Sequence, residues 1–389
     1  MELALAGPAL ADPHRRTARS TRPSPPARDR PLVIAHRGAS GYRPEHTLAS
    51  YRLAIRMGAD YVEPDLVSTS DGVLVARHEN EISGTTDVAS HPELADRRTT
   101  KTIDGREVTG WFTEDLTLAE LRTLRAVERL PGVRPDNTRY DGRYRVPTFD
   151  EVLDLVERES RRRGEVIGVY PETKHPTHFD SVGLSLDEPL AGALRRHGLD
   201  RPNARVFVQS FETTNLRRLA ATVRVPLVQL VARSGAPYDL VAAGDPRTYD
   251  DLLTPVGLRE ISTYADAIGP DKDRVIPRDA DGYRTEPTSL VDDAHGAGLR
   301  VHTYTFRDEC RFLPADCREG SDPDAMGAAL REYAAFFDVG VDGVFTDFAD
   351  TALRARGSWL RERAATPPMP VTSVVHRDGH NSPSRACGR

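Results

Sequence analysis

Three carboxylates occupy positions in this sequence where together they could bind a metal ion. Glu63 and Asp65 lie two residues apart in the stretch DYVEPDLV, and a β-strand there would direct both side chains to one face. Glu172 lies near the end of a second apolar stretch, EVIGVYPETK. Converging carboxylates are costly unless a cation neutralises them, and hard oxygen ligands favour Mg²⁺ or Ca²⁺ over Zn²⁺. The pattern predicts one divalent cation, Ca²⁺ or Mg²⁺, bound by Glu63, Asp65 and Glu172.

Histidines and cationic residues end other apolar runs of the same kind. His36 and Arg37 follow PLVIA, His78 follows VLVAR, and Lys174 comes two residues after Glu172. Histidine titrates near neutral pH and suits general acid–base chemistry, while arginine and lysine bind phosphate. Each position alone is more often structural than functional. Their joint occurrence at the ends of the apolar runs predicts a single site.

The elements that must position these side chains alternate along the chain. Short apolar runs that predict strands alternate with amphipathic segments that predict helices, which is typical of an α/β protein with a parallel sheet. The predicted strands are PLVIAH, DYVEPDLV, VLVARH, EVIGVYPETK, RVFVQSF, VPLVQLV, LRVHTYTF and GVFTDF, with ADAIGP as a weaker candidate. The number of strands favours a (β/α)8 TIM barrel, whose active site lies at the carboxyl ends of the strands. A doubly wound open sheet is the alternative.

The sequence divides into a leader, one large domain and a tail. Residues 1–30 are rich in Pro, Arg and Ser, residues 31–356 carry the barrel pattern, and residues 357–389 are predicted to form a disordered tail. A polar segment at about 80–145 interrupts the pattern after the third predicted strand. We interpret it as a small insertion, either a cap over the active site or a plain surface excursion.

Composition narrows the class of protein and its location. The chain has 389 residues, a formal net charge of -6 and no apolar run long enough to cross a membrane, so it gives no indication of nucleic-acid or transmembrane function. The N-terminal MELALAGPALADPHRR resembles the end of a signal peptide, which predicts a secreted or extracytoplasmic protein, and a disordered leader is the alternative. Cys310 and Cys317 form either a local disulfide or two unpaired surface thiols, and Cys387 is predicted to be unpaired.

Six sequence segments together resemble the glycerophosphodiester phosphodiesterase family, in particular its larger periplasmic or secreted branch. The segments are HRGASGYRPEHT, GADYVEPDLVSTSDGVLVARHE, PETK, QSF, VHTYTF and GVDGVFTDF, and the likeness covers about residues 31–355. His46 stands where the family usually has Asn. Tyr170 and Pro171 precede Glu172 where an apolar strand residue is more usual.

The resemblance implies a role for each matching residue. It implies that Glu63, Asp65 and Glu172 bind the metal, that His36 and His78 are catalytic, and that Arg37, Lys174 and Glu45 serve the phosphate site. Phe211 and Tyr304 are expected either to wall the glycerol pocket or to pack in the core. His302 is a further candidate for the mouth of the barrel, and Asp347 is predicted to cap the following helix.

The resemblance also implies an activity. It implies metal-dependent hydrolysis of glycerophosphodiesters to an alcohol and sn-glycerol 3-phosphate, with a cyclic phosphate intermediate and a small-molecule substrate as the partner. A lysophospholipase D and a hydrolase of glycerophosphate polymers such as teichoic acid are alternatives within this class. A catalytically silent barrel that binds phosphodiesters is the alternative of another class, and it predicts the loss of a histidine or carboxylate that this chain retains.

Overall fold

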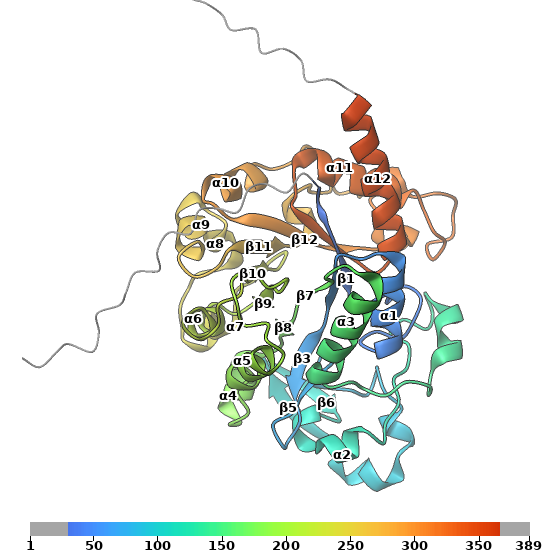
Figure 1. Ribbon diagram of the computed structural model, residues 1–389, viewed down its shortest axis with the longest axis vertical. Helices are drawn as coiled ribbons and strands as arrows, with labels where there is room; N and C mark the ends of the chain where they lie inside the picture. Colours follow the sequence, from blue (N-terminus) through green and yellow to red (C-terminus); the bar gives the residue numbers. More distant parts are fainter. Residues whose placement is uncertain (1–29, 366–389) are drawn as a thin grey trace, which may run out of the picture.

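The computed structural model describes residues 30–365, in which parallel strands are surrounded by helices (Figure 1). The predicted α/β class with a parallel sheet is confirmed. The strands are β1 (Leu32–His36), β2 (Tyr61–Glu63), β3 (Asp65–Ser68), β4 (Leu74–Ala76), β5 (Thr99–Ile103), β6 (Arg106–Gly110), β7 (Gly168–Val169), β8 (Glu172–Thr173), β9 (Val208–Ser210), β10 (Leu227–Val231), β11 (Ala267–Pro270), β12 (Arg300–Phe306) and β13 (Gly343–Thr346).

The helices follow the strands in alternation, and several begin and end at residues that favour those positions. The Thr148 side chain accepts a hydrogen bond from the backbone of Glu151 at the start of α3, and Gly164 ends this helix in the left-handed conformation. The helices are α1 (Leu48–Met57), α2 (Leu118–Leu121), α3 (Phe149–Arg163), α4 (Pro176–Ser181), α5 (Asp187–Arg196), α6 (Thr213–Thr222), α7 (Tyr238–Ala242), α8 (Tyr249–Leu252), α9 (Pro255–Ile261), α10 (Leu290–Gly296), α11 (Ala329–Val339) and α12 (Ala349–Ala365).

The main sheet returns to its own starting point through two interrupted strands. Parallel pairing runs in the order β8-β9-β10-β11-β12-β13-β1-β2-β7. Strand β2 continues into β3 after Pro64, β7 continues into β8 after Tyr170 and Pro171, and β3 pairs with β8. Proline has no N–H to donate to the sheet, which accounts for an interruption at both places. The pairings therefore form a ring in which the β2–β3 and β7–β8 segments are neighbours along their whole length.

One predicted strand is not part of this ring. Strand β4, from the segment VLVARH, pairs only antiparallel with β3 among the named strands, and the weak candidate ADAIGP instead supplies β11 between β10 and β12. The connection from Ser68 to Leu74 is a tight turn in which Thr69 N–H donates to the Val73 carbonyl at 3.0 Å. Such a short turn permits a hairpin, whereas a parallel strand needs a crossover of a dozen or more residues.

The ring separates two groups of buried side chains. Leu32 and Ile34 of β1 lie inside it with Tyr61, Phe207 and Phe345, while the alternate residues of β1 face the surrounding helices. Period-two alternation along each strand produces this division. The interior group closes the ring below the level of the predicted catalytic residues.

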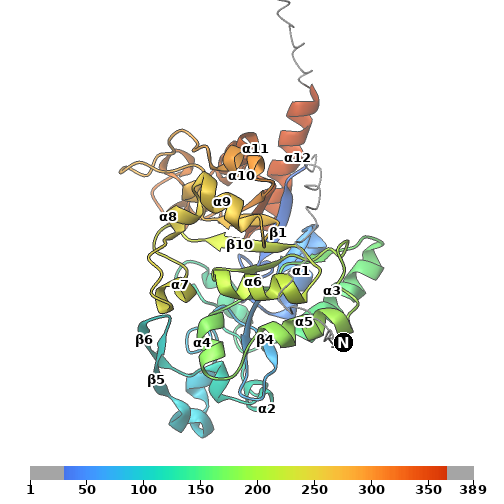
Figure 2. The same ribbon diagram turned by 90° about the vertical axis from the view of Figure 1, so that its left-hand side faces the viewer.

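The segment 80–145 follows β4 and carries structure of its own. It holds the antiparallel hairpin β5–β6, the short helix α2 and several 3₁₀ turns, and it forms one end of the molecule with β5, β6 and α2 at its edge (Figure 2). The part from Glu128 to Tyr140 approaches the ring, where Arg134 contacts Ser40 and Asp347, which follow β1 and β13.

The prediction that residues 357–389 form a disordered tail needs correction. Helix α12 continues to Ala365, so residues 357–365 are not a disordered tail. Trp359 holds this part of the helix, because its ring packs 5.7 Å from that of Phe337 and its Nε1 donates to Asp338 at 2.8 Å. Residues 1–29 and 366–389, which include most of the predicted leader, the rest of the tail and Cys387, lie outside the described residues.

Cys310 and Cys317 are free, and both are buried, so they form neither the disulfide nor the surface thiols considered from the sequence. Cys310 Sγ instead accepts a hydrogen bond from the backbone of Glu319 at 3.4 Å. Within residues 30–365, none of the helices has the length and apolar character needed to traverse a bilayer.

Candidate active site

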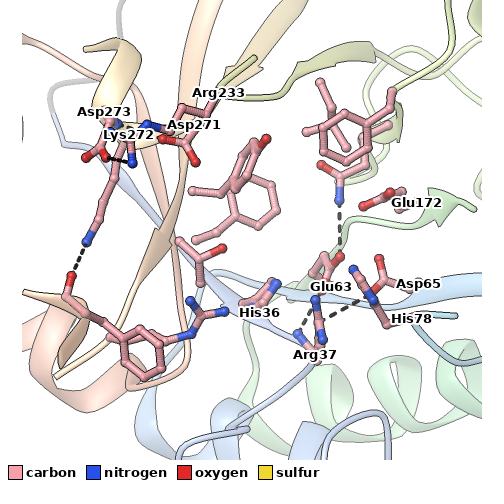
Figure 3. A pocket seen from close by; sticks show the side chains of 18 of the residues that line it. His36, Arg37, Glu63, Asp65, His78, Glu172, Arg233, Asp271, Lys272 and Asp273 are labelled. Atoms are coloured by element: carbon pink, nitrogen blue, oxygen red, sulfur yellow. Dashed lines mark hydrogen bonds and ion pairs between the residues drawn. The ribbon is translucent and has the colours of Figure 1, made fainter. Parts of the chain in front are cut away.

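A cavity of about 440 Å³ opens at the carboxyl ends of the strands and brings most of the predicted site together (Figure 3). The three carboxylates and His78 lie on one side of it, and Arg233 with Asp271–Asp273 lies on the other. Its lining includes eight sequence-predicted residues besides Asp65: His36, Arg37, Glu63, His78, Glu172, Lys174, Phe211 and Tyr304. Among the described residues, Glu45 and the mouth candidate His302 do not line the cavity.

The three predicted metal ligands form a buried cluster. Strand register places His36 beside Glu63 and Asp65 beside Glu172, so oxygens of the three carboxylates lie within 4.8 Å of one another. Burial and mutual repulsion raise the pKa of Glu63 well above its usual value and that of Glu172 to about 8. Burial also acts on Asp65, but Lys174 and His46 hold its pKa well below the usual value.

The cluster has the properties expected of a divalent-cation site. All its donors are carboxylate oxygens, and the buried Asp65 Oδ1 has no hydrogen-bond partner in the described part of the chain. A buried, unpartnered carboxylate oxygen is costly unless a ligand or ion satisfies it. The residues therefore fit a hard cation such as Ca²⁺ or Mg²⁺.

Arg37 and Lys174 place positive charge beside these carboxylates. Lys174 Nζ lies 2.7 Å from Glu172 Oε1, and the backbone N–H of Arg37 donates to Glu63 Oε2 at 2.8 Å. Arg37 Nη1 donates to Glu45 Oε2 at 2.9 Å. Glu45 therefore acts on the cavity indirectly, since it fixes the direction of the Arg37 guanidinium from behind.

His36 at the end of β1 is held by a carboxylate at the end of β13. Its Nδ1 lies 2.6 Å from Asp347 Oδ1, so Nδ1 carries the proton and Nε2 is left for the cavity. Burial and the nearby Arg37 lower the pKa of His36 to about 4. The prediction that Asp347 caps a helix is wrong, because its carboxylate accepts hydrogen bonds from His36, Arg134 and Arg307.

His78 has a matching arrangement with its neighbour in sequence. Its Nδ1 makes a short contact with Glu79 Oε1. Burial, Arg37 and Lys174 lower the pKa of His78 to about 3. Both histidines are thus neutral at pH 7, and each has a carboxylate on Nδ1.

Behind the cluster, His46 supports Asp65. His46 Nε2 lies 2.9 Å from Asp65 Oδ2, and His46 Nδ1 lies 2.7 Å from the Tyr51 hydroxyl. A carboxylate can only accept, so Nε2 carries the proton and the Tyr51 hydroxyl donates to Nδ1. The His46 side chain, at the position where the family usually has Asn, thus donates a hydrogen bond to a predicted metal ligand.

The aromatic candidates divide between the cavity and the ring interior. Phe211 and Tyr304 line the cavity and also pack against each other, with ring centroids 6.0 Å apart. Their role as walls of a glycerol pocket stays a prediction. His302 does not belong to the mouth. It is fully buried, and its Nδ1 is 2.7 Å from the hydroxyl of Tyr170, the residue that replaces the usual apolar one.

Sequence reasoning missed the roles of four residues around the predicted catalytic histidines. Glu79 contacts His78 and Asp347 contacts His36, and these two carboxylates accept hydrogen bonds from Arg129 and Arg134 respectively. Glu79 directly follows His78, so adjacency was an available signal. Asp347 ends a predicted strand as His36 does, so the rule applied to His36 would also have selected it. The two arginines lie in an irregular segment, where the sequence offers no periodicity to place them.

Comparison with known proteins agrees with this geometry. The model of the glycerophosphoryl diester phosphodiesterase family matches residues 36–351. Glycerophosphodiester phosphodiesterase GDPD6 of Arabidopsis thaliana is 35% identical over 332 residues, covering 82% of this chain and 84% of that protein. Glycerophosphodiester phosphodiesterase of Haemophilus influenzae is 30% identical over 347 residues, covering 83% and 88%.

Solved structures share the fold at lower identity. A protein from Silicibacter pomeroyi described as a glycerophosphoryl diester phosphodiesterase has a TM-score of 0.59 at 22% identity, covering 86% of this chain and 94% of that one. A phosphodiesterase of Oleispira antarctica, solved in complex with the product sn-glycerol-3-phosphate, has a TM-score of 0.55 at 20% identity, covering 84% and 96%. The sequence matches carry the assignment of family, and with it phosphodiesterase activity. The chain belongs to the glycerophosphoryl diester phosphodiesterase family.

Proposed function

We propose that this chain is a metal-dependent glycerophosphodiesterase that releases an alcohol and sn-glycerol 3-phosphate by acid–base catalysis with His36 and His78. The observation that carries the proposal is the pairing of two neutral histidines, each with a carboxylate on Nδ1, around one cavity that also holds Arg37 and Lys174. The product bound to the Oleispira antarctica relative supports the same class of substrate.

Glu63, Asp65 and Glu172 would hold one Ca²⁺ or Mg²⁺. When bound, the cation would offset charge on the phosphate during displacement. Arg37 donates charge-assisted hydrogen bonds to the phosphate, held in direction by Glu45, and Lys174 adds a second positive charge. Phe211 and Tyr304 supply an apolar wall for the glycerol carbons.

In the first step one histidine Nε2 takes the proton of the glycerol hydroxyl next to the phosphate. The hydroxyl oxygen bonds to phosphorus, the bond to the alcohol oxygen breaks, and the second histidine donates a proton to that oxygen. In the second step the histidine that acted as acid takes a proton from water, and the water oxygen bonds to phosphorus. The ring bond between phosphorus and the attacking glycerol oxygen of the first step breaks, and the other histidine returns its proton to that oxygen. The histidine acting as acid gains its proton in the substrate complex, where the phosphate anion offsets the repulsion from Arg37 and Lys174.

Release of glycerol phosphate from glycerophosphocholine by the purified protein tests the proposal. Activity should be lost in EDTA, should return with Ca²⁺ or Mg²⁺, and should fall at least about 100-fold in His36→Ala and in His78→Ala. His91→Ala, a surface histidine of the 80–145 segment, is the matched control and should retain activity. Wild-type activity in His36→Ala would refute the mechanism.

The cyclic route has a separate test. Propylphosphocholine has the same choline leaving group as glycerophosphocholine but lacks a hydroxyl next to the phosphodiester, so it cannot form the ring. We expect its turnover to be at least about 100-fold slower than that of glycerophosphocholine, since the intramolecular nucleophile is lost. Equal turnover of both would indicate direct attack by water.

A further inference from the structure

Both proposed catalytic histidines are connected to the 80–145 segment through a carboxylate and an arginine. Asp347 and Glu79 each accept from a histidine Nδ1 and from an arginine of this segment, Arg134 and Arg129 respectively. We propose that Arg129 and Arg134 are positioning residues for catalysis, which hold the two histidines in register through these carboxylates. The inference rests on the proposed function of His36 and His78.

The contacts of Arg134 fix the carboxylate of Asp347 from one side. Arg134 Nη2 donates to Asp347 Oδ2 at 2.7 Å while His36 Nδ1 lies 2.6 Å from Oδ1, so the two oxygens serve different partners. Arg134 Nε donates to Glu309 Oε1 at 2.6 Å and its Nη1 to the Ser40 carbonyl at 3.0 Å. The Arg134 guanidinium is buried and bound on three sides, so it restricts rotation of the Asp347 carboxylate. Because His36 is bonded to this carboxylate, the plane of the His36 ring is restricted as well.

Arg129 fixes the carboxylate of Glu79 in the same way, and through Glu45 it also acts on Arg37. Its guanidinium donates to both oxygens of Glu79, one at 3.0 Å. Its Nε and Nη2 donate to the two oxygens of Glu45 at 2.8 and 2.7 Å. Glu45 in turn accepts from Arg37, so one side chain of the segment orients both His78 and the proposed phosphate ligand.

The placement of the two arginines separates positioning from substrate binding. Neither lines the 440 Å³ cavity, so neither contacts substrate there. They lie five positions apart in one short stretch, which Asn137 anchors by donating to Glu128 Oε2 at 3.0 Å and to the Ser40 carbonyl at 3.3 Å. The segment is therefore a support for the catalytic groups, beyond the cap or surface excursion that its sequence indicates.

A double-mutant cycle distinguishes positioning from a general structural role. Arg134→Met should lower kcat about 10- to 100-fold with KM changed less than about 3-fold. Arg307 also donates to Asp347, at 2.9 Å, so the carboxylate keeps one cationic partner in this variant. In the Asp347→Asn background, Arg134→Met should cause little further loss, because its effect passes through Asp347. Arg129→Met should lose only part of its effect in the Glu79→Gln background, because Arg129 also acts on Arg37 through Glu45.

Crossed pairs and a surface arginine are the controls. When Arg134→Met is combined with Glu79→Gln, the two fold losses in kcat should multiply, because the two chains of contacts reach different histidines. Arg143→Met should leave kcat unchanged, because Arg143 is an exposed arginine of the same segment whose guanidinium lies over the Tyr140 ring, 5.6 Å from its centroid. Losses for Arg134→Met that are equal in the wild-type and Asp347→Asn backgrounds would overturn the inference.

A spectroscopic measurement tests the inference independently of turnover. The proton on His36 Nδ1, assigned by its loss in His36→Ala, should give a far-downfield ¹H resonance because it is bonded to a carboxylate. Arg134→Met should shift or broaden it, and Arg143→Met should not. An unchanged resonance in Arg134→Met would overturn the inference. If Arg134→Met changes the resonance as expected but the wild-type protein has no turnover, the proposed function alone would be contradicted.

Discussion

At the scale of single residues, His46 is a side chain whose two hydrogen bonds define its role. It donates to Asp65 through Nε2 and accepts from Tyr51 at Nδ1, so it fixes one oxygen of Asp65 and leaves Oδ1 for a ligand. Partners of this kind commonly hold a metal ligand in its binding orientation.

We therefore expect His46→Leu to weaken cation binding about 10- to 100-fold. The substitution removes both hydrogen bonds and roughly keeps the side-chain volume. Tyr51→Phe removes only the outer bond and should cost less. Titration calorimetry with Ca²⁺ and with Mg²⁺ measures both variants, and equal affinity for wild type and His46→Leu would contradict the expectation.

The lowered histidine pKa values predict a pH dependence of stability. The pKa of His36 is about 4 in the folded protein and near 6.5 when unfolded, so the unfolded state binds more protons between these values. Its contribution to the free energy of unfolding is therefore present above about pH 6.5 and is lost as the pH falls towards 4.

His36→Gln removes this contribution. Urea unfolding of wild type and variant at intervals from pH 7 to pH 4.5 should show a shallower loss of stability on acidification in His36→Gln. Parallel curves for the two proteins would show that His36 is not held neutral by the fold.

At the scale of elements, the turn from β1 to α1 presents His36, the first of the two proposed catalytic histidines. Arg37 and Gly38 both have positive φ values, 58° and 88°, and a Cβ on Gly38 would lie 2.5 Å from Ser50 Oγ and 2.7 Å from the Ser50 carbonyl carbon. Helix α1 thus packs against a backbone that only glycine permits at this point.

Gly38→Ala should lower the free energy of unfolding by at least about 2 kcal/mol, from the positive φ and the close contact together. Gly72 is a suitable control, since it also has a positive φ, 77°, but nothing lies within 4 Å of a Cβ there. Gly72→Ala should cost only about 1 kcal/mol. Similar losses in urea unfolding of the two variants would show that α1 shifts to accommodate the methyl group.

The secondary-structure elements also show how much of the fold and the site could be predicted from the sequence. Period-two runs ending in polar residues were sufficient to place His36, Glu63, Asp65 and Glu172 at one edge, because carboxyl ends of parallel strands converge. The direction of β4 was missed, since its apolar run has the same composition as a barrel strand and only the short turn before it differs. The roles of Arg129 and Arg134 depend on tertiary contacts of an irregular segment, which no local pattern encodes.

At the scale of the whole molecule, the proposed cation should couple to stability. Three buried carboxylates repel one another in the folded state, and a cation that binds only this state adds about 2.7 kcal/mol when its free concentration is 100 times Kd. Thermal unfolding should therefore move to higher temperature with added Ca²⁺ or Mg²⁺.

Glu172→Gln should abolish this rise in Tm, whereas Glu188→Gln, an exposed carboxylate on α5, should retain it. Calorimetric scans at a series of cation concentrations provide the measurement. A cation-dependent shift of equal size in Glu172→Gln would place the binding site elsewhere.

The contact between β1 and β13 also has a consequence for how activity arises during biosynthesis. His36 and Asp347 lie 311 residues apart in the sequence, and the strands that carry them are neighbours in the sheet. A nascent chain that has not yet emerged as far as β13 cannot orient His36. Hydrolysis of phosphodiesters would thus begin only after synthesis of the domain is nearly complete and its last strand has docked against its first.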